Sequence, residues 1–347
     1  DDKLANLKSD GTHSRSGIPV IQISRNIADH ILQTKNGNLD DLEAQIISGT
    51  PEFKPIMIDH NIYARTNIIE IKQSTFNILA KIDGGDPLLK NESIVIGAHY
   101  DHLGMGGRHS GSRRPHQNEI HNGADDNASG VAGMLRLAGQ FQKHGPPKRS
   151  IIFAAFGAEE MGLIGSKFLM SSKLIDHDQI QLMINMDMIG RLNDQNRLAI
   201  GGSGTALNLE TTLDSLLNLT TLNHTFKPEG FGPSDHSSFY VNDIPVVFFF
   251  TGAHDDYHTP DDDPEKINYD GIIQITNAIY SVVDYYSQLD EKLVFQEAGP
   301  KESKARSSFK VTLGIMPDYI YSGKGLRVDA VKEEGPARNS GILKGDI

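Results

Sequence analysis

Four uninterrupted apolar runs mark the middle of the chain, and amphipathic stretches separate them. The runs cover residues 94–96, 151–156, 182–184 and 246–250. Continuous apolarity indicates strands with both faces covered, as in a parallel sheet between layers of helices. The stretches 131–141 and 269–286 carry apolar residues at helical spacing, with Leu135 and Ile273 among those expected to face the core. This alternation predicts an α/β domain with a mixed, mostly parallel central sheet flanked by helices.

The flanks depart from this pattern and predict accessory segments. A strand-like run at 18–24 precedes helical spacings that are interrupted near Gly37, whereas residues 294–308 are polar and indicate a linker. We therefore divide the chain into a lead-in at 1–66, a main domain at 67–293, a linker at 294–308 and a partial module at 309–347. Because Asp1 is not a natural start, we expect the chain to be part of a longer protein.

Composition excludes several classes of function. The net charge is -12, from 45 acidic and 33 basic residues, which argues against a nucleic-acid or anionic-membrane partner. The chain has no cysteine, so a disulfide framework, a thiolate nucleophile and a Cys-ligated zinc are excluded. No apolar run approaches the ~20 residues that a membrane-spanning helix needs.

Metal-capable side chains follow each of the four apolar runs. In open α/β sheets, ligands bind at the carboxyl ends of the strands, so these side chains are predicted to converge. A fifth acidic segment, which contains Asp126, precedes the first amphipathic helix. The residues that follow the runs are His99 and Asp101, then Glu159 and Glu160, then Asp187, and finally Tyr257 and His258.

Electrostatics indicates what such a cluster requires. Four carboxylates in one cleft without cations would force some to be protonated, or would destabilise the fold. Two divalent cations remove this conflict: if Asp126 bridges them, each takes one histidine, one further carboxylate and a shared water. Mixed imidazole and carboxylate ligands suit two zinc ions per chain, with cobalt or manganese as substitutes.

These five segments, in this order, resemble those of the M28 family of metallopeptidases, the di-zinc aminopeptidases of bacterial secreted type. The resemblance covers roughly residues 75–290. It implies a zinc exopeptidase fold, the N-termini of peptides or proteins as substrate, and a bacterial periplasmic, outer-membrane-associated or secreted location. Matched by position, it implies one zinc on His99 and Asp187, the other on Glu160 and His258, and Asp126 bridging both.

The resemblance also implies roles for three further side chains. Glu159 matches the general base that takes a proton from the water bridging the two zinc ions. Asp101 matches the carboxylate that orients His99, and Tyr257 resembles a tyrosine that donates a hydrogen bond to the substrate carbonyl. A cis peptide bond between Asp126 and Asn127 is also expected.

The flanks resemble known modules in part. Residues 14–50 are similar to the closing part of a protease-associated domain. The last ~40 residues look like the first half of a PDZ domain, in which Leu313, Gly314 and Ile315 resemble a carboxylate-binding loop. A peptide is the partner that this PDZ-like segment implies.

Other polar residues near these motifs are interpreted without a catalytic role. His102 either supports the site or lies on the surface, and His109, His116 and His121 are expected to be exposed in a Gly- and Arg-rich loop. The three aspartates at 261–263 are expected to form a solvated acidic turn.

Several functions compete with the aminopeptidase. A carboxypeptidase or dipeptidase of the same family would use identical metal chemistry, a glutaminyl-cyclase-like transferase would use one zinc, and a non-catalytic receptor would lack ligands. The complete ligand set favours the di-zinc enzyme. The acidic surroundings suit a protonated substrate amine, which favours an aminopeptidase.

Overall fold

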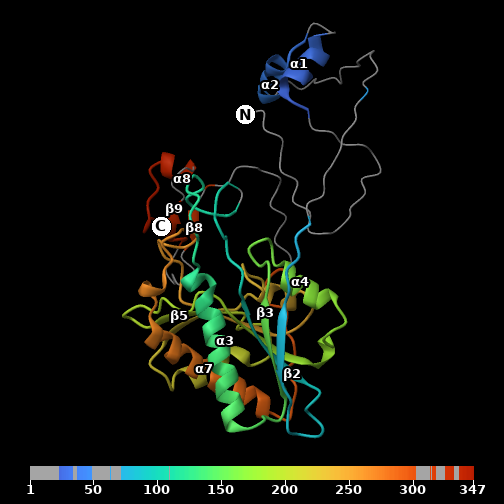
Figure 1. Cartoon of the computed structure of the whole chain (residues 1–347), viewed down its shortest axis with the longest axis vertical. Helices are drawn as coiled ribbons and strands as arrows, with labels where there is room; N and C mark the ends of the chain where they lie inside the picture. Colours follow the sequence, from blue (N-terminus) through green and yellow to red (C-terminus); the bar gives the residue numbers. More distant parts are fainter. Residues whose placement is uncertain are drawn as a thin grey trace. The chain divides into compact units, whose positions relative to one another are not determined.

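The computed structural model describes residues 23–33, 37–48, 63, 72–108, 110–301, 313, 315–317, 325–331 and 336–347 (Figure 1). The chain divides into two compact units, residues 1–73 and residues 74–347. The second unit contains a seven-stranded sheet. Its strands are β1 (Ile78–Ile82), β2 (Ser93–His99), β3 (Ser150–Phe156), β4 (Ile180–Met186), β5 (Arg197–Gly201), β6 (Asn223–Lys227) and β7 (Val246–Phe250).

The sheet has the strand order β1-β3-β2-β4-β7-β5-β6. The four neighbouring strands β3, β2, β4 and β7 run parallel, as do β5 and β6. β1 pairs antiparallel with β3, and β5 pairs antiparallel with β7. The fold is therefore a mixed, mostly parallel sheet, as the sequence predicts. The carboxyl ends of its four central strands lie along one edge.

Helices cover both faces of this sheet. The helices and helical turns between residues 124 and 288 are η1 (Ala124–Ser129), α3 (Gly130–His144), α4 (Ile164–Ser171), η2 (His177–Gln179), α5 (Leu209–Leu217), α6 (His236–Tyr240), η3 (Pro264–Lys266) and α7 (Tyr269–Gln288). Alternate residues of β2 point to opposite faces. Ile94 and Ile96 pack in the cluster that includes α3, α5 and α7, whereas Val95 packs in the cluster that includes α4 and α6.

The four predicted core strands are confirmed, and so are helices over 131–141 and 269–286. Two core assignments are wrong: Leu135 is 65% exposed and Ile273 is 43% exposed. On α3, Leu137 is fully buried instead. The predicted face of α3 is therefore rotated around the helix axis, since the buried stripe follows Met134, Leu137 and Phe141 at spacings of three and four.

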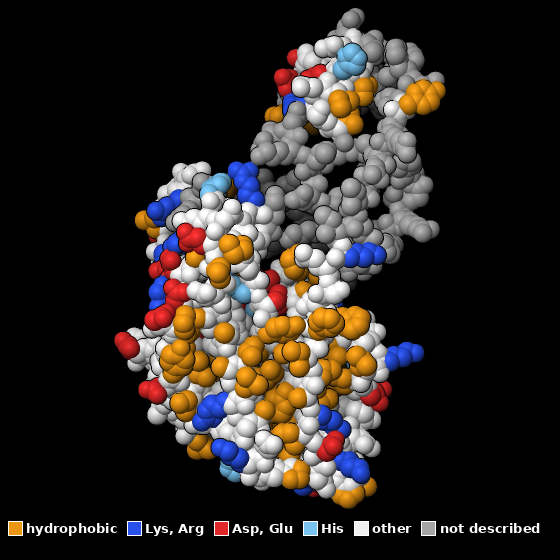
Figure 2. Space-filling view, viewed as in Figure 1, with side chains coloured by type: hydrophobic (Ala, Val, Ile, Leu, Met, Phe, Trp, Pro, Cys, Tyr) orange, Lys and Arg blue, Asp and Glu red, His pale blue; other side chains and the backbone are white. Residues whose placement is uncertain are grey.

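β1 forms one edge of the sheet and carries exposed apolar side chains, among them Ile78 and Leu79. Figure 2 shows hydrophobic side chains gathered between α3 and α4 on the face in view.

Within the described part of the chain, no helix has the length and apolarity to cross a membrane.

The first unit contains α1 (Arg25–Gln33) and α2 (Leu39–Ile47), with Gly37 between them as predicted. Arg25 pairs with Asp40 and Glu43 across the two helices. Most of the strand predicted at 18–24 lies outside the described residues, so the resemblance to a protease-associated domain stays a prediction.

The end of the chain contains β8 (Ile315–Pro317), β9 (Val328–Val331) and α8 (Pro336–Asn339). β8 and β9 pair antiparallel. Gly314 of the predicted carboxylate-binding loop lies outside the described residues. At the start of the predicted linker, Phe295 forms a β-bridge with Ala206, and Gln296 donates its N–H to Thr205 O, so residues 294–296 are bound to the main domain.

Candidate active site

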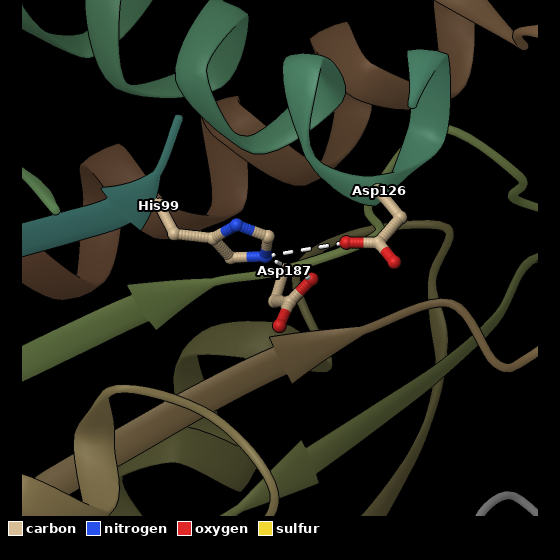
Figure 3. A group of neighbouring side chains, drawn as sticks. All are labelled: His99, Asp126 and Asp187. Atoms are coloured by element: carbon tan, nitrogen blue, oxygen red, sulfur yellow. Dashed lines mark ion pairs between the residues drawn. The ribbon is translucent and has the colours of Figure 1, made fainter. Parts of the chain in front are cut away.

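The carboxyl edge of the sheet brings the five predicted ligands together. His99 is the last residue of β2, and Asp187 directly follows β4. Glu160 follows β3 by four residues and His258 follows β7 by eight, both in loops above the same edge. Asp126 reaches the site from η1, directly below the start of α3 (Figure 3). We refer to these residues as the five-residue cluster.

The cluster consists of two groups that share one carboxylate. In the first group, His99 Nε2 lies 3.2 Å from Asp126 Oδ1 and 3.4 Å from Asp187 Oδ1 (Figure 3). In the second group, His258 Nε2 lies 3.2 Å from Asp126 Oδ2 and 3.2 Å from Glu160 Oε2. Asp126 therefore turns one oxygen to each group, which is the arrangement of a bridging ligand.

These separations fit tetrahedral zinc. Ligand atoms about 2.0–2.1 Å from a tetrahedral ion lie about 3.3–3.4 Å from one another. The four measured separations are 3.2–3.4 Å, longer than a strong charge-assisted hydrogen bond. The donor set of two imidazoles and three carboxylates also suits zinc. The residues present therefore fit two zinc ions.

The pKa values of the cluster show how strongly these groups interact. Burial alone would lower the pKa of both imidazoles. The adjacent carboxylates outweigh burial, so the pKa of His99 lies well above its usual value and that of His258 rises to about 10. Burial would likewise raise the pKa of Asp126, but His258 and His99 hold it well below its usual range. Metal ions must displace the protons on the imidazoles, since a ligating imidazole is neutral at the metal-facing nitrogen.

Hydrogen bonds at the far side of each imidazole fix its orientation. His99 Nδ1 donates to the main-chain oxygen of Asp101 at 3.0 Å, and His258 Nδ1 donates to Gly111 O at 3.2 Å. The Asp101 carboxylate lies 3.8 Å from His99 Nδ1 and accepts the main-chain N–H groups of Glu159 and Glu160. Asp101 thus orients His99 through its carbonyl and holds the loop after β3 through its carboxylate.

Glu159 and Tyr257 line the same cavity as the cluster. Burial, together with nearby carboxylates such as Asp187, raises the pKa of Glu159 to about 10. Tyr257 stacks on the ring of His258 with centroids 3.8 Å apart. Burial and then the charges of Asp126 and Glu160 raise its pKa well above 10, so its hydroxyl stays protonated and can donate a hydrogen bond.

The cavity has a second, apolar end. The volume of the whole cavity, both ends included, is about 390 Å³. Phe248 stacks on Phe250, with centroids 5.7 Å apart, and on the buried ring of His236 at 4.4 Å. The sequence alone gives no signal for this end, because its residues come from two strands and two loops. The apolar pocket, as we call it, is lined by Met188, Ala199, Phe231, Phe248 and Phe250.

A buried carboxylate supports Asp126. Asp262 Oδ2 accepts the main-chain N–H groups of Asp125 at 2.9 Å and Asp126 at 3.1 Å, and Arg191 pairs with Asp262 Oδ1 at 2.9 Å. The prediction of a solvated turn is wrong for Asp262, which is fully buried. The sequence does not indicate which of the three consecutive aspartates points inward.

The expected cis peptide bond between Asp126 and Asn127 is present.

One of the other histidines differs from its expectation, and another agrees with one of its two alternatives. His121, expected to be exposed, is buried and shares a 2.8 Å hydrogen bond with Ser112 Oγ. His102 does not lie on the surface, because its Nδ1 contacts Glu160 Oε1 at 2.8 Å. His116 is exposed as predicted, and His109 lies outside the described residues.

Comparisons with known proteins find relatives of the main domain. Residues 77–283 match the family model for Peptidase family M28. The probable leucine aminopeptidase 2 of Trichophyton verrucosum is 29% identical over 256 residues, 64% of this chain and 48% of that protein. The leupeptin-inactivating enzyme 1 of Streptomyces exfoliatus is 31% identical over 180 residues, 51% of this chain and 36% of that protein. The chain spans about half the length of the leucine aminopeptidases it matches, and less of the Streptomyces enzyme.

Solved structures show the same fold. A zinc aminopeptidase from Bacillus subtilis superimposes with a TM-score of 0.51 at 24% identity, over 62% of this chain and 51% of that chain. An aminopeptidase from Aneurinibacillus sp. strain AM-1 superimposes with a TM-score of 0.50 at 29% identity, over 64% of this chain and 50% of that chain.

Proposed function

The chain belongs to peptidase family M28, and on that premise we propose that it releases N-terminal amino acids from peptides by metal-dependent hydrolysis. Relatives named as leucine aminopeptidases support the exopeptidase activity and its direction. The zinc named for the Bacillus subtilis enzyme of the same fold supports the choice of metal.

Two zinc ions per chain are the central part of this proposal. The observation that carries it is the shared carboxylate: Asp126 lies 3.2 Å from both His99 Nε2 and His258 Nε2, through different oxygens. Asp187 completes one group and Glu160 the other. Each ion would then have three protein ligands and one open position, as catalytic zinc requires.

The roles of the surrounding residues follow from their positions. When bound, the two ions would polarise a shared water and the carbonyl of the scissile bond, and would lower the pKa of Glu159. Glu159 would accept the proton of the attacking water and return it to the departing amine. Tyr257, held protonated, would donate a hydrogen bond to the carbonyl oxygen as negative charge develops there.

The apolar pocket would hold the side chain of the N-terminal residue. It adjoins the cluster in one cavity and is walled by Met188, Phe248 and Phe250. An apolar pocket selects by buried surface, so a large apolar residue such as leucine is favoured over alanine or a charged residue. The carboxylates of the cluster would attract the protonated amine of the same substrate.

A panel of substrates tests this function directly. Chromogenic leucine and alanine amides are compared with peptides whose N-terminus is acetylated, each with and without a chelator. We expect the leucine amide to be cleaved fastest, the acetylated peptides to resist, and the chelator to abolish activity until zinc is restored. Cleavage of acetylated peptides from the other end would instead indicate a carboxypeptidase. Cyclisation of N-terminal glutamine with one zinc per chain would indicate a glutaminyl-cyclase-like transferase.

A further inference from the structure

A third imidazole lies at the five-residue cluster without a role in the mechanism above. His102 follows His99 by three residues, and its side chain is 9% exposed. Its Nδ1 lies 2.8 Å from Glu160 Oε1 and 3.8 Å from Asp126 Oδ2. By proximity alone, His102 could be another metal ligand or a residue that holds a ligand in place.

The distances distinguish these two roles. His258 Nε2 lies 3.2 Å from Glu160 Oε2, close to the separation of about 3.3–3.4 Å expected of two ligands on one zinc ion. His102 contacts the other oxygen of Glu160, Oε1, at a normal hydrogen-bond length of 2.8 Å. The two oxygens of Glu160 therefore face different imidazoles, one at ligand spacing and one at hydrogen-bond spacing.

We propose that His102 is a positioning residue that donates a hydrogen bond from Nδ1 to Glu160 Oε1, so that only Oε2 of Glu160 is presented to the second metal. This inference rests on the proposed two-zinc function. A glutamate has one more rotatable bond than an aspartate, so its carboxylate needs more restraint. The main chain of Glu160 is held by Asp101 Oδ2 at 3.3 Å, and His102 restrains the opposite end of the same residue.

The ring of His102 is itself fixed in place. It packs edge-on against the ring of His258, with centroids 5.7 Å apart and an interplanar angle of 72°. Gly123 makes room for it, because a Cβ at Gly123 would lie 2.7 Å from His102 Cγ. Gly123 also has φ +60°, so a larger residue there is doubly disfavoured. The loop that delivers Asp126 is thereby shaped around His102.

A selective loss of metal affinity should result from removing this hydrogen bond. Partners of metal ligands typically contribute 10–100-fold in metal affinity. We expect the loss to fall on the ion held by Glu160 and His258, and the ion held by His99 and Asp187 to be unaffected. A general loss of structure would weaken both.

Zinc titration of the metal-free protein, followed by calorimetry, tests this inference. His102→Leu removes the donor, and His102→Asn keeps an N–H donor near the position of Nδ1. His258→Ala identifies the binding step of the second ion, and His144→Leu, at the exposed end of α3, is the matched control. We expect His102→Leu to weaken only that second step by about 10–100-fold, His102→Asn to restore most of it, and the control to change nothing.

Each other outcome would overturn the inference. An unchanged second step in His102→Leu would show that the hydrogen bond has no such role. Complete loss of one ion in both His102 variants would make His102 a metal ligand. Equal weakening of both steps would indicate a general structural role. The wild-type protein tests the proposed function separately: if it binds fewer than two zinc ions, the two-zinc function fails, and the inference with it.

Discussion

The two ends of the central cavity lie on the same edge of the same sheet, yet they consist of opposite kinds of residue. The five-residue cluster contains only ionisable side chains, and hydrogen bonds that its members donate to Asp101, Gly111 and Asp262 hold it in place. The apolar pocket is held by packing, with the stacked rings of Phe248 and Phe250 forming one wall. Chemistry and selectivity are therefore assigned to separate sets of residues, which can be changed independently.

The largest effect is expected from a change beside the five-residue cluster. Glu159→Gln removes the proposed base but none of the five ligands. We expect kcat to fall by about 10²–10⁴-fold, the range that general-base catalysis contributes. The ratio of activity on leucine and alanine amides should stay unchanged, because the apolar pocket is intact. Steady-state kinetics and zinc content check both points. Wild-type kcat in this variant would remove the base assignment.

The next largest effect is expected from a change at Asp262, the carboxylate that supports Asp126. Asp262→Ala leaves two buried main-chain N–H groups unpaired and removes one partner of Arg191. We expect a loss of about 3 kcal/mol in the free energy of unfolding, and zinc bound about 10–100-fold more weakly. Denaturant unfolding and zinc titration measure these losses. Asp261→Asn, at a half-exposed pair with Arg114, is the control and should change stability by less than about 1 kcal/mol. Equal effects at the two positions would contradict the role of Asp262.

A change in the apolar pocket should affect selectivity alone. Gly201 of β5 also lines the cavity, and a Cβ there would lie 3.4 Å from Phe248, so a small side chain fits. Gly201→Val would occupy the space of the substrate side chain. We expect kcat/KM for the leucine amide to fall by about 10–100-fold, with a much smaller change for the alanine amide. Gly201→Ala should show an intermediate effect. Equal losses on both amides would mean that the pocket does not bind the N-terminal side chain.

The smallest expected effect concerns His236, a polar ring in the apolar wall. Burial lowers its pKa to about 3, from an ordinary value of 6.5. A lowered folded-state pKa means that its contribution to stability is full above pH 6.5 and is lost as pH falls toward 3. At pH 5 the loss is about 2 kcal/mol. In chelator, His236→Gln should therefore lose less stability than wild type between pH 7 and pH 5. Parallel pH profiles would contradict this.

The difference between the five-residue cluster and the apolar pocket also explains how much of the site the sequence predicts. Each predicted ligand except Asp126 follows an apolar run, and the parallel strands of those runs place their ends together. β1, β5 and β6 were not predicted, because they lie toward the edges of the sheet and carry short or polar runs such as Asn223–Lys227. A continuous apolar pattern arises only where both faces of a strand are covered.

Residues that act through long-range packing could not be predicted. The burial of Asp262 depends on Arg191, which lies 71 residues away in the sequence. The burial of His121 depends on Ser112 and on the path of a glycine-rich loop. The apolar pocket likewise combines Ala199 of β5 with Phe250 of β7, and no local pattern in the sequence indicates that pairing.

The central claim is that two zinc ions share Asp126. An anomalous difference map from crystals of the zinc-loaded protein tests it most directly. We expect two peaks about 3.5–4 Å apart, one beside His99 and Asp187 and the other beside Glu160 and His258. A single peak at this edge of the sheet, or zinc bound only elsewhere, would contradict the account.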